Sequence, residues 1–268
     1  MADPLLFVGV GTSFVLSGVS LYLYKEKLKE LQKLKEIPVF RPNQKLLKEL
    51  QARQHKKLQY VAVEGRVQAD GESLSSPYVP QCLGVVQKIA EQQQWKYWNP
   101  RSKTWNSRST SRKESNNAVP FSLVDHQAYI SDISIKVLNP LQASGSYLET
   151  VHCRVRRPVE GVVDVLLQGL SGEKPGAMEE REEMLRVGSV VTGFGEVVLE
   201  SGNEMKLQAP HDGRAFILIS SDHKSFMDRH EASASMWKSF AAFTGITGSV
   251  LLAKAVYSIM GKRDEKSK

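Results

Sequence analysis

Residues 240–260 read FAAFTGITGSVLLAKAVYSIM, an apolar run in which Lys254 is the one charged residue. A second apolar run, LLFVGVGTSFVLSGVSLYLY, occupies residues 5–24 and carries no charge. As a helix, the run at residues 5–24 is about 30 Å long, which matches the hydrocarbon thickness of a typical bilayer. If both runs cross a membrane, the two tails lie on one side of it and the polar middle of the chain lies on the other.

The run at residues 5–24 favours an uncleaved membrane anchor over a secretory signal peptide. The charged residue before it is Asp3 rather than a basic cluster, and no Ala-x-Ala cleavage site closes it. Its small residues include Ser13 and Ser17, whose spacing lets two helix backbones approach closely. Because the run lacks a strict Gly-x-x-x-Gly, we interpret these residues as tolerated in a bilayer helix rather than as a helix contact.

The run at residues 240–260 meets one further condition before it can span a bilayer. Its uncharged core, residues 239–253, is short, so Lys254 must extend its ammonium group to the nearby interface. Trp237 and Tyr257 are placed where an interfacial aromatic belt is expected. The alternative is an amphipathic helix that lies on the membrane surface.

The chain divides into five segments. They are a transmembrane anchor (1–24), a basic helical connector (25–59), a β-rich domain (60–220), a long helix that includes the second span (221–260) and a basic tail (261–268). The predicted fold class is therefore an α+β membrane protein, with a mostly antiparallel β soluble domain between two transmembrane helices. A mean hydropathy of -0.31 excludes a polytopic transporter. The net charge of +7 suggests nucleic acid, anionic lipid or acidic proteins as partners without choosing among them.

The strand pattern of the middle segment begins where Val61, Val63 and Val67 alternate with polar residues. Similar signals recur at residues 83–90, 130–137, 162–167, 190–199, 205–208 and 215–219. The strands at 190–199 and 205–208 are predicted to form a hairpin that turns at Ser201, Gly202 and Asn203. One helix is predicted inside the domain, at residues 178–185, because four glutamates gather in its opening turns, where the helix dipole favours acids. They are Glu179, Glu180, Glu182 and Glu183.

No residue pattern in this domain predicts an active site or a metal site. Gly193-Phe194-Gly195 lies inside a strand pattern, which indicates close backbone packing or a bulge rather than a dinucleotide loop. His152 and Cys153 are neighbours on a strand and point to opposite faces, so we interpret them as a surface histidine and a structural cysteine. Cys82 and Cys153 form no Cys-x-x-Cys pair. We favour two free buried thiols, and a disulfide between them stays an alternative.

Residues 95–113 combine aromatic and basic side chains without an acid. Lys96, Arg101, Lys103 and Arg108 are candidate contacts for an anionic partner, because cations attract phosphates and aromatic rings stack on bases. The competing interpretation is a hairpin that turns at residues 99–102, with its aromatic rings packed on the sheet and its basic tail in a mobile loop. Between membrane anchors, the pattern favours that hairpin or an acidic-lipid contact over nucleic acid.

Several stretches of the middle segment match a known family in order. They are Val63-Glu64-Gly65, Gly84-Val85-Val86-Gln87, Val119-Pro120-Phe121-Ser122-Leu123-Val124, Val137-Leu138-Asn139-Pro140-Leu141, Leu148-Glu149-Thr150-Val151, Ser171-Gly172-Glu173, Glu182-Glu183-Met184-Leu185-Arg186-Val187-Gly188, Thr192-Gly193-Phe194-Gly195-Glu196 and Leu207-Gln208. Through them the chain resembles the MULAN/MAPL family of mitochondrial outer-membrane E3 ubiquitin ligases. The resemblance implies two transmembrane helices around a "beside a membrane" (GIDE) domain, followed by a cytosolic RING. It also implies transfer of ubiquitin or SUMO to proteins of mitochondrial organisation, antiviral signalling and cell death.

The RING is the part of the family pattern that this sequence does not match. A RING needs eight Cys or His ligands around two zinc ions, and none follows Met260. We therefore assign no catalytic, cofactor or metal residue, and expect a RING-less module that binds partner proteins, including full-length family members. The resemblance places it in the mitochondrial outer membrane with its β-rich domain in the intermembrane space. Two alternatives stay open: an incomplete copy of an active E3 ligase, and a lipid- or nucleic-acid-binding module acting through residues 95–113.

Overall fold

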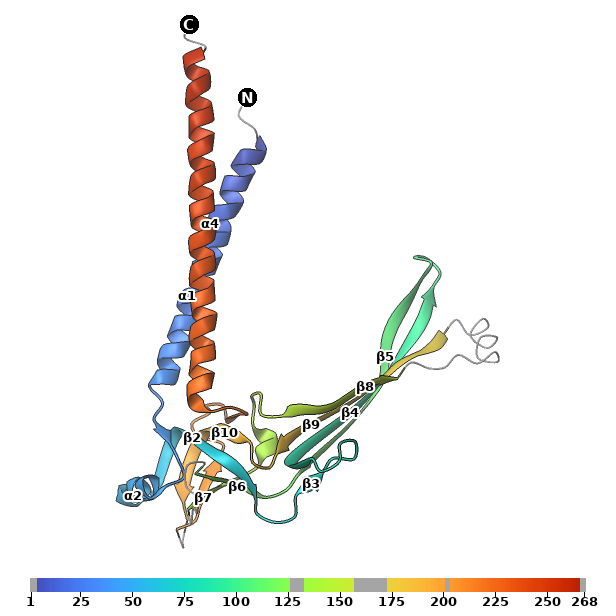
Figure 1. The fold of residues 1–268 in the computed structure, drawn as a ribbon, viewed down its shortest axis with the longest axis vertical. Helices are drawn as coiled ribbons and strands as arrows, with labels where there is room; N and C mark the ends of the chain where they lie inside the picture. The colour runs from blue at the N-terminus through green and yellow to red at the C-terminus, as the bar shows by residue number, and fades with distance from the viewer. Residues whose placement is uncertain (1–3, 126–132, 157–172, 201–202, 266–268) are drawn as a thin grey trace. The chain divides into compact units, whose positions relative to one another are not determined.

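The computed structural model describes the backbone of residues 4–125, 133–156, 173–200 and 203–265. The chain forms two compact units, one made of residues 1–38 and 224–268 and the other of residues 39–223. Helices make the first unit and two β-sheets make most of the second (Figure 1). The strand at 162–167 and the turn residues Ser201 and Gly202 lie outside the described residues.

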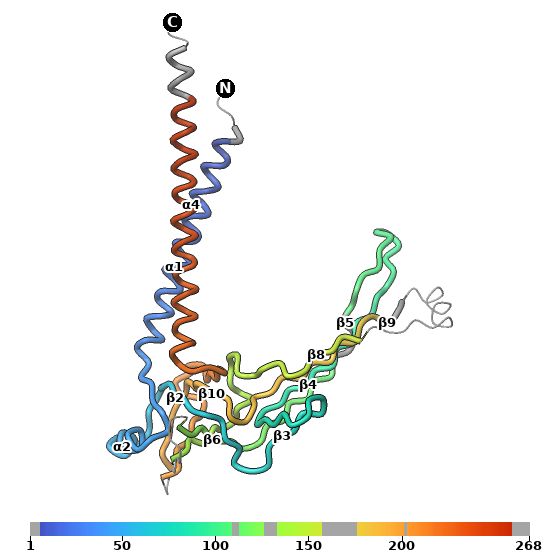
Figure 2. Tube along the Cα trace, viewed as in Figure 1, coloured from blue at the N-terminus to red at the C-terminus, as the bar shows by residue number. Residues whose placement is uncertain are grey.

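The helical unit consists of α1 (Pro4–Lys35) and α4 (His223–Glu265), both long enough and apolar enough to cross a membrane. They pack side by side and run in opposite directions (Figure 2). The predicted basic connector is helical only in part. α1 ends three residues before Pro38, and a short strand and a short helix follow it.

The short helix is α2 (Gln44–Ala52), which begins at a capping residue and packs through one apolar face. The Asn43 side chain accepts hydrogen bonds from the N–H groups of Lys45 and Leu46, both at 3.1 Å, and so satisfies two free donors of the first turn. Leu46 and Leu50 are fully buried in the core of the second unit. The spacing of four puts both leucines on one face of the helix.

Five strands of the second unit close into a barrel. Their order is β2 (Lys57–Ala69), β6 (Phe121–Val124), β7 (Ser134–Val137), β11 (Met205–Gln208) and β10 (Val190–Leu199), and β10 pairs with β2 to complete the ring. All neighbours are antiparallel except β7 and β11. These five strands form a small closed β-barrel. Two short strands extend it, β1 (Val39–Phe40) on β2 and β12 (Ile217–Ile219) on β10.

A second sheet is formed by the two long segments that connect strands of the barrel. The connection from β2 to β6 contributes β3 (Leu74–Ser75), β4 (Leu83–Asn99) and β5 (Thr104–Ala118), and the connection from β7 to β10 contributes β8 (Glu149–Arg156) and β9 (Glu173–Arg186). The two parts join through the antiparallel pairing of β4 with β9. The mostly antiparallel β domain is confirmed, and so is the hairpin of β10 and β11.

The predicted helix at residues 178–185 is wrong, because these residues lie within β9. Glu182 and Met184 are fully buried and Arg181 is exposed, which is the alternation of a strand rather than the repeat of a helix. β9 pairs with β4 along one edge and with β8 along the other. Hydrogen bonding on both edges therefore overrides the helical preference of the glutamates.

The glycines at 193 and 195 are required by close packing, as the sequence predicted. A Cβ atom at Gly193 would lie 2.6 Å from a Leu207 methyl group, and one at Gly195 would lie 2.6 Å from the carbonyl oxygen of Gln208. The register of β10 against β2 also shifts between Gly195 and Val197, which is a bulge. This segment is a tight part of the barrel wall.

We predict that Gly195→Ala lowers the free energy of unfolding by roughly 1 to 3 kcal/mol, because the added methyl group meets backbone that has no room to move. Thermal unfolding of the full chain in detergent measures the change. Gly71→Ala is the matched control, since a Cβ atom there has no neighbour within 4 Å. Equal stability of the two variants would contradict the packing described for β10.

Candidate functional site

The four predicted anion contacts lie on the hairpin of β4 and β5, but the structure does not bring them into one patch. Trp98 pairs with Trp105, Lys96 with Ser107 and Trp95 with Arg108 across the hairpin. Directly opposed residues share a face, so Lys96 lies on the Trp98 face and Arg108 lies on the other. Arg101 and Lys103 occupy the turn, where both are exposed.

The hairpin itself is confirmed, and two details of that interpretation are wrong. Trp98 and Trp105 are 41% and 40% exposed instead of packed on the sheet. Their rings meet each other edge to face, with centroids 5.6 Å apart. The basic tail is strand β5 rather than a loop, because its backbone pairs with β4 from Thr104 to Ala118.

The small residues of α1 form the contact with α4, which corrects the interpretation that they are merely tolerated. Ser17 Oγ donates a hydrogen bond to the carbonyl oxygen of Ala241 at 3.0 Å. A Cβ atom on Gly248 would lie 3.2 Å from Ser13 Cβ, and one on Gly245 would lie 3.3 Å from Ser17 Oγ. Small side chains thus let the two backbones approach, as in membrane helix pairs.

Hydroxyl groups of this helix pair donate hydrogen bonds to backbone carbonyls, and the charged residues Lys35, Glu231 and Lys254 are exposed. Thr244 Oγ1 donates to the carbonyl oxygen of Phe240 at 2.9 Å, as intramembrane hydroxyls commonly do. Lys35 and Glu231 form an ion pair at 2.7 Å between the two helices. Lys254 is exposed, so its ammonium group is not held in the helix contact and can reach an interface.

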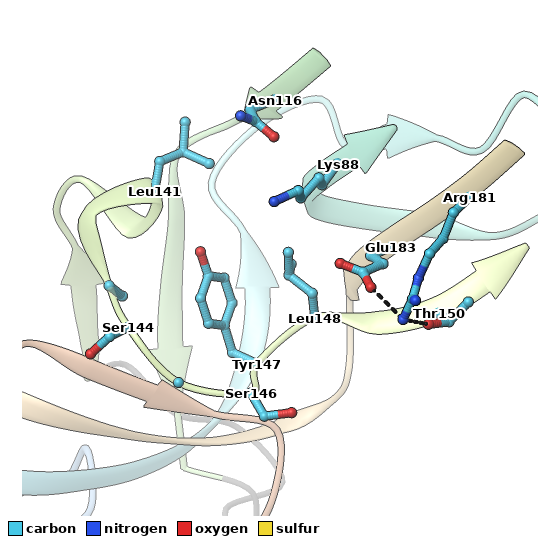
Figure 3. Close-up of a pocket in the computed structure, with 12 residues that line it drawn as sticks. Lys88, Asn116, Leu141, Ser144, Ser146, Tyr147, Leu148, Thr150, Arg181 and Glu183 are labelled. Carbon is cyan, nitrogen blue, oxygen red and sulfur yellow. Dashed lines mark hydrogen bonds and ion pairs between the residues drawn. The ribbon is translucent and has the colours of Figure 1, made fainter. Parts of the chain in front are cut away.

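A cavity of about 620 Å³ lies where the segment 141–148 covers the second sheet (Figure 3). Its cations are already paired: Lys88 with Glu114 at 2.7 Å, and Arg181 with Glu183 at 2.7 Å. Arg181 also donates to Thr150 at 3.0 Å. The cavity therefore offers hydrogen bonds but no unpaired cation for an anionic ligand.

A buried carboxylate, missed by the sequence analysis, fixes the loop that follows β3. Glu182 is fully buried and accepts hydrogen bonds from Ser76 Oγ at 2.5 Å and Gln87 Nε2 at 2.7 Å. Ser76 Oγ in turn accepts the N–H groups of Tyr78 and Val79. Two donors satisfy the carboxylate, so this cluster is structural. Burial, with the nearby carboxylates, raises the pKa of Tyr78 and keeps its phenol neutral.

The cysteines and histidines of the described residues do not gather into one cluster. Cys82 is partly buried, Cys153 is exposed, and both are free, so the prediction of two buried thiols fails for Cys153 and the disulfide alternative is wrong. His152 is half-buried, and its ring stacks on that of Tyr78 with the centroids 4.5 Å apart. No group of three or more His, Cys, Asp or Glu that could hold a metal ion occurs in the described part of the chain.

The helix contact can be tested by cross-linking. In a chain with Cys82→Ser and Cys153→Ser, we expect Ser13→Cys with Gly248→Cys to form an intramolecular disulfide on mild oxidation, because the two Cβ atoms come close to disulfide distance. Gel mobility at monomer mass with and without reductant measures it. Gly11→Cys with Gly248→Cys is the control, since a Cβ atom at Gly11 has no neighbour within 4 Å. Equal cross-linking of both pairs would contradict the helix contact.

Comparisons with known proteins agree with the architecture. The GIDE family model, described as E3 ubiquitin ligase, matches residues 91–253. The chain is 37% identical over 245 residues to mitochondrial ubiquitin ligase activator of nfkb 1-A of Danio rerio, covering 91% of this chain and 71% of the relative. It is 34% identical over 239 residues to mitochondrial ubiquitin ligase activator of NFKB 1 of Homo sapiens, covering 89% of this chain and 67% of the relative.

A more distant relative is mitochondrial E3 ubiquitin protein ligase 1 of Drosophila melanogaster, 24% identical over 78% of this chain and 60% of its own length. No solved structure matches the chain. The vertebrate matches extend over about nine-tenths of the sequence. The chain therefore belongs to the GIDE family of mitochondrial E3 ubiquitin ligases.

Proposed function

We propose that residues 1–268 form a membrane-anchored binding and regulatory module of a mitochondrial ubiquitin ligase family. α1 and α4 cross the outer membrane as a hairpin, both tails are cytosolic, and the β domain lies in the intermembrane space. The observation that carries this proposal is the pairing of α1 with α4. Their side chains are small where the two helices touch, and large and apolar on the outer surface of the pair.

The outward side chains of the pair favour lipid over water. Phe243, Ile246 and Val250 of α4 are 69%, 66% and 63% exposed, and Val15 of α1 is 66% exposed. In water, each such side chain would leave roughly 1.5 to 3 kcal/mol of burial energy unrealised. A bilayer supplies the apolar surroundings, whereas the second unit has a buried apolar core of its own.

Family membership supports a role in protein ubiquitination and mitochondrial organisation, since the relatives are named as mitochondrial ligases and ligase activators. We assign the described residues to anchoring and to protein binding, and none of them to zinc or E2 binding. Full-length family members and other proteins are the proposed partners. Translation of the genomic sequence beyond the codon for Lys268 tests the alternative of an incomplete ligase copy, which an in-frame array of Cys-x-x-Cys ligands would support.

Protease protection in intact mitochondria tests the topology. With a tag at each end, we expect external protease to remove both tags and to spare the β domain until the outer membrane is ruptured, because two spans put both ends on one side. The protein should also stay in the membrane pellet after alkaline carbonate extraction. A C-terminal tag that survives external protease would contradict the hairpin.

An autoubiquitination assay tests catalysis directly. Purified residues 1–268 with E1, E2 and ubiquitin are expected to form no ubiquitin chains, because the described residues hold no cluster able to bind the zinc of a RING. The control is the same chain joined at its C-terminus to the RING of a ligase of known activity. Chain formation by residues 1–268 alone, at the rate of the fusion, would refute the binding role.

A further inference from the structure

The end of the β4–β5 hairpin presents large rings to solvent. β9 begins opposite Tyr97, and from Trp98 to Trp105 the two strands pair only with each other among the described residues. Tyr97, Trp98 and Trp105 are 39%, 41% and 40% exposed. Trp and Tyr combine an apolar body with a polar edge, which suits them to the layer between lipid headgroups and acyl chains.

The turn of the same hairpin carries two exposed cations, Arg101 and Lys103. Asn99 Oδ1 accepts the N–H group of Arg101 at 3.0 Å, and Lys103 takes a left-handed conformation with φ of 53°, so the turn has a defined shape. Arg101 and Lys103 are exposed and form no ion pair with any described residue. Residues 95–113 contain no Asp or Glu.

From these features we infer that the hairpin end, residues 96–108, docks on an anionic lipid bilayer. Arg101 and Lys103 contact lipid phosphates, and Trp98 and Trp105 enter the headgroup layer beside them. Cations near an anionic leaflet are attracted within about one Debye length. The inference rests on the proposed function in one respect: anchoring by α1 and α4 keeps the hairpin at a high local concentration of lipid.

The arrangement of the rings favours lipid over single-stranded nucleic acid. Base stacking needs open ring faces along the path of the strand. Here Trp98 and Trp105 pack edge to face on each other, at an interplanar angle of 62°, and form one compact apolar tip. Lys96 and Arg108 lie on opposite faces of the hairpin, so the cations flank the tip and do not line a groove.

Tryptophan fluorescence can report the contact in the full chain. Three of the four tryptophans are Trp95, Trp98 and Trp105, so Trp237→Phe leaves indoles only in the hairpin. The chain is reconstituted in vesicles of phosphatidylcholine, or of phosphatidylcholine mixed with phosphatidylserine, each with brominated lipid as quencher. We expect quenching and a blue shift in the anionic vesicles, a weak effect in the neutral ones, and reversal in high salt.

Charge reversal at the turn separates a specific contact from general attraction. Arg101→Glu with Lys103→Glu should lower the equilibrium constant for contact, taken from the quenched fraction, at least about tenfold. Lys45→Glu with Lys48→Glu on α2 is the matched control, because both lysines are exposed and the net charge changes equally. Circular dichroism confirms that both variants fold. The inference is overturned if both variants lose the contact equally, or if quenching is the same in neutral and anionic vesicles.

Two further measurements distinguish the sources of failure. Loss of flotation with neutral vesicles would refute the anchoring alone, and salt-sensitive flotation with anionic vesicles that disappears on charge reversal would still support the hairpin contact. Binding of a labelled single-stranded RNA that is lost in Arg101→Glu with Lys103→Glu, without lipid quenching, would assign the hairpin to nucleic acid and overturn the lipid contact.

Discussion

The second unit depends on the antiparallel pairing of β2 with β10, which closes the barrel. The same strand β2 also holds both points at which the chain enters and leaves this unit. Phe40 of β1 pairs with Val63, and the neighbouring residue Glu64 accepts the first N–H group of α4, that of His223, at 3.0 Å. Glu64 is buried and also pairs with Arg41 at 3.1 Å. A negative charge at a helix N-terminus is favourable, and this one carboxylate contacts residues near both ends of the second unit.

Sequence patterns predicted the elements whose local and tertiary preferences agree. β10 is rich in β-branched residues, β11 alternates apolar and polar residues, and α1 and α4 are long apolar helices, so each pattern has one interpretation. β9 could not be predicted in this way, because a run of glutamates prefers a helix until two neighbouring strands pair with it. Most of β5 was predicted as a loop because Thr104–Ala118 is almost entirely polar, and its strand conformation comes from pairing with β4.

The candidate sites could also be predicted only in part: composition indicates which residues belong to them, and strand register decides where those residues lie. The absence of acids identified Lys96, Arg101, Lys103 and Arg108 as a group, but their distribution over two faces follows from cross-strand register. The helix contact is harder still to foresee, because Ser17 meets Ala241 across 224 residues of sequence. A sequence shows which face of a helix has small side chains and which has apolar ones. It does not show which face contacts a partner helix, because that depends on how the partner is rotated about its own axis.

The construction of the second sheet from two separate barrel connections has a consequence for folding. Gly84 of β4 pairs with Arg186 of β9, so this edge of β4 can be covered only after most of the polypeptide has been synthesised. Before then, the β4–β5 hairpin can form by itself but leaves a long row of unpaired backbone groups. Such late, non-local pairing is slow and exposes the nascent chain to aggregation. The polar composition of β5 helps to keep this hairpin soluble before β9 is made, so residues that weakened the sequence signal protect the folding chain.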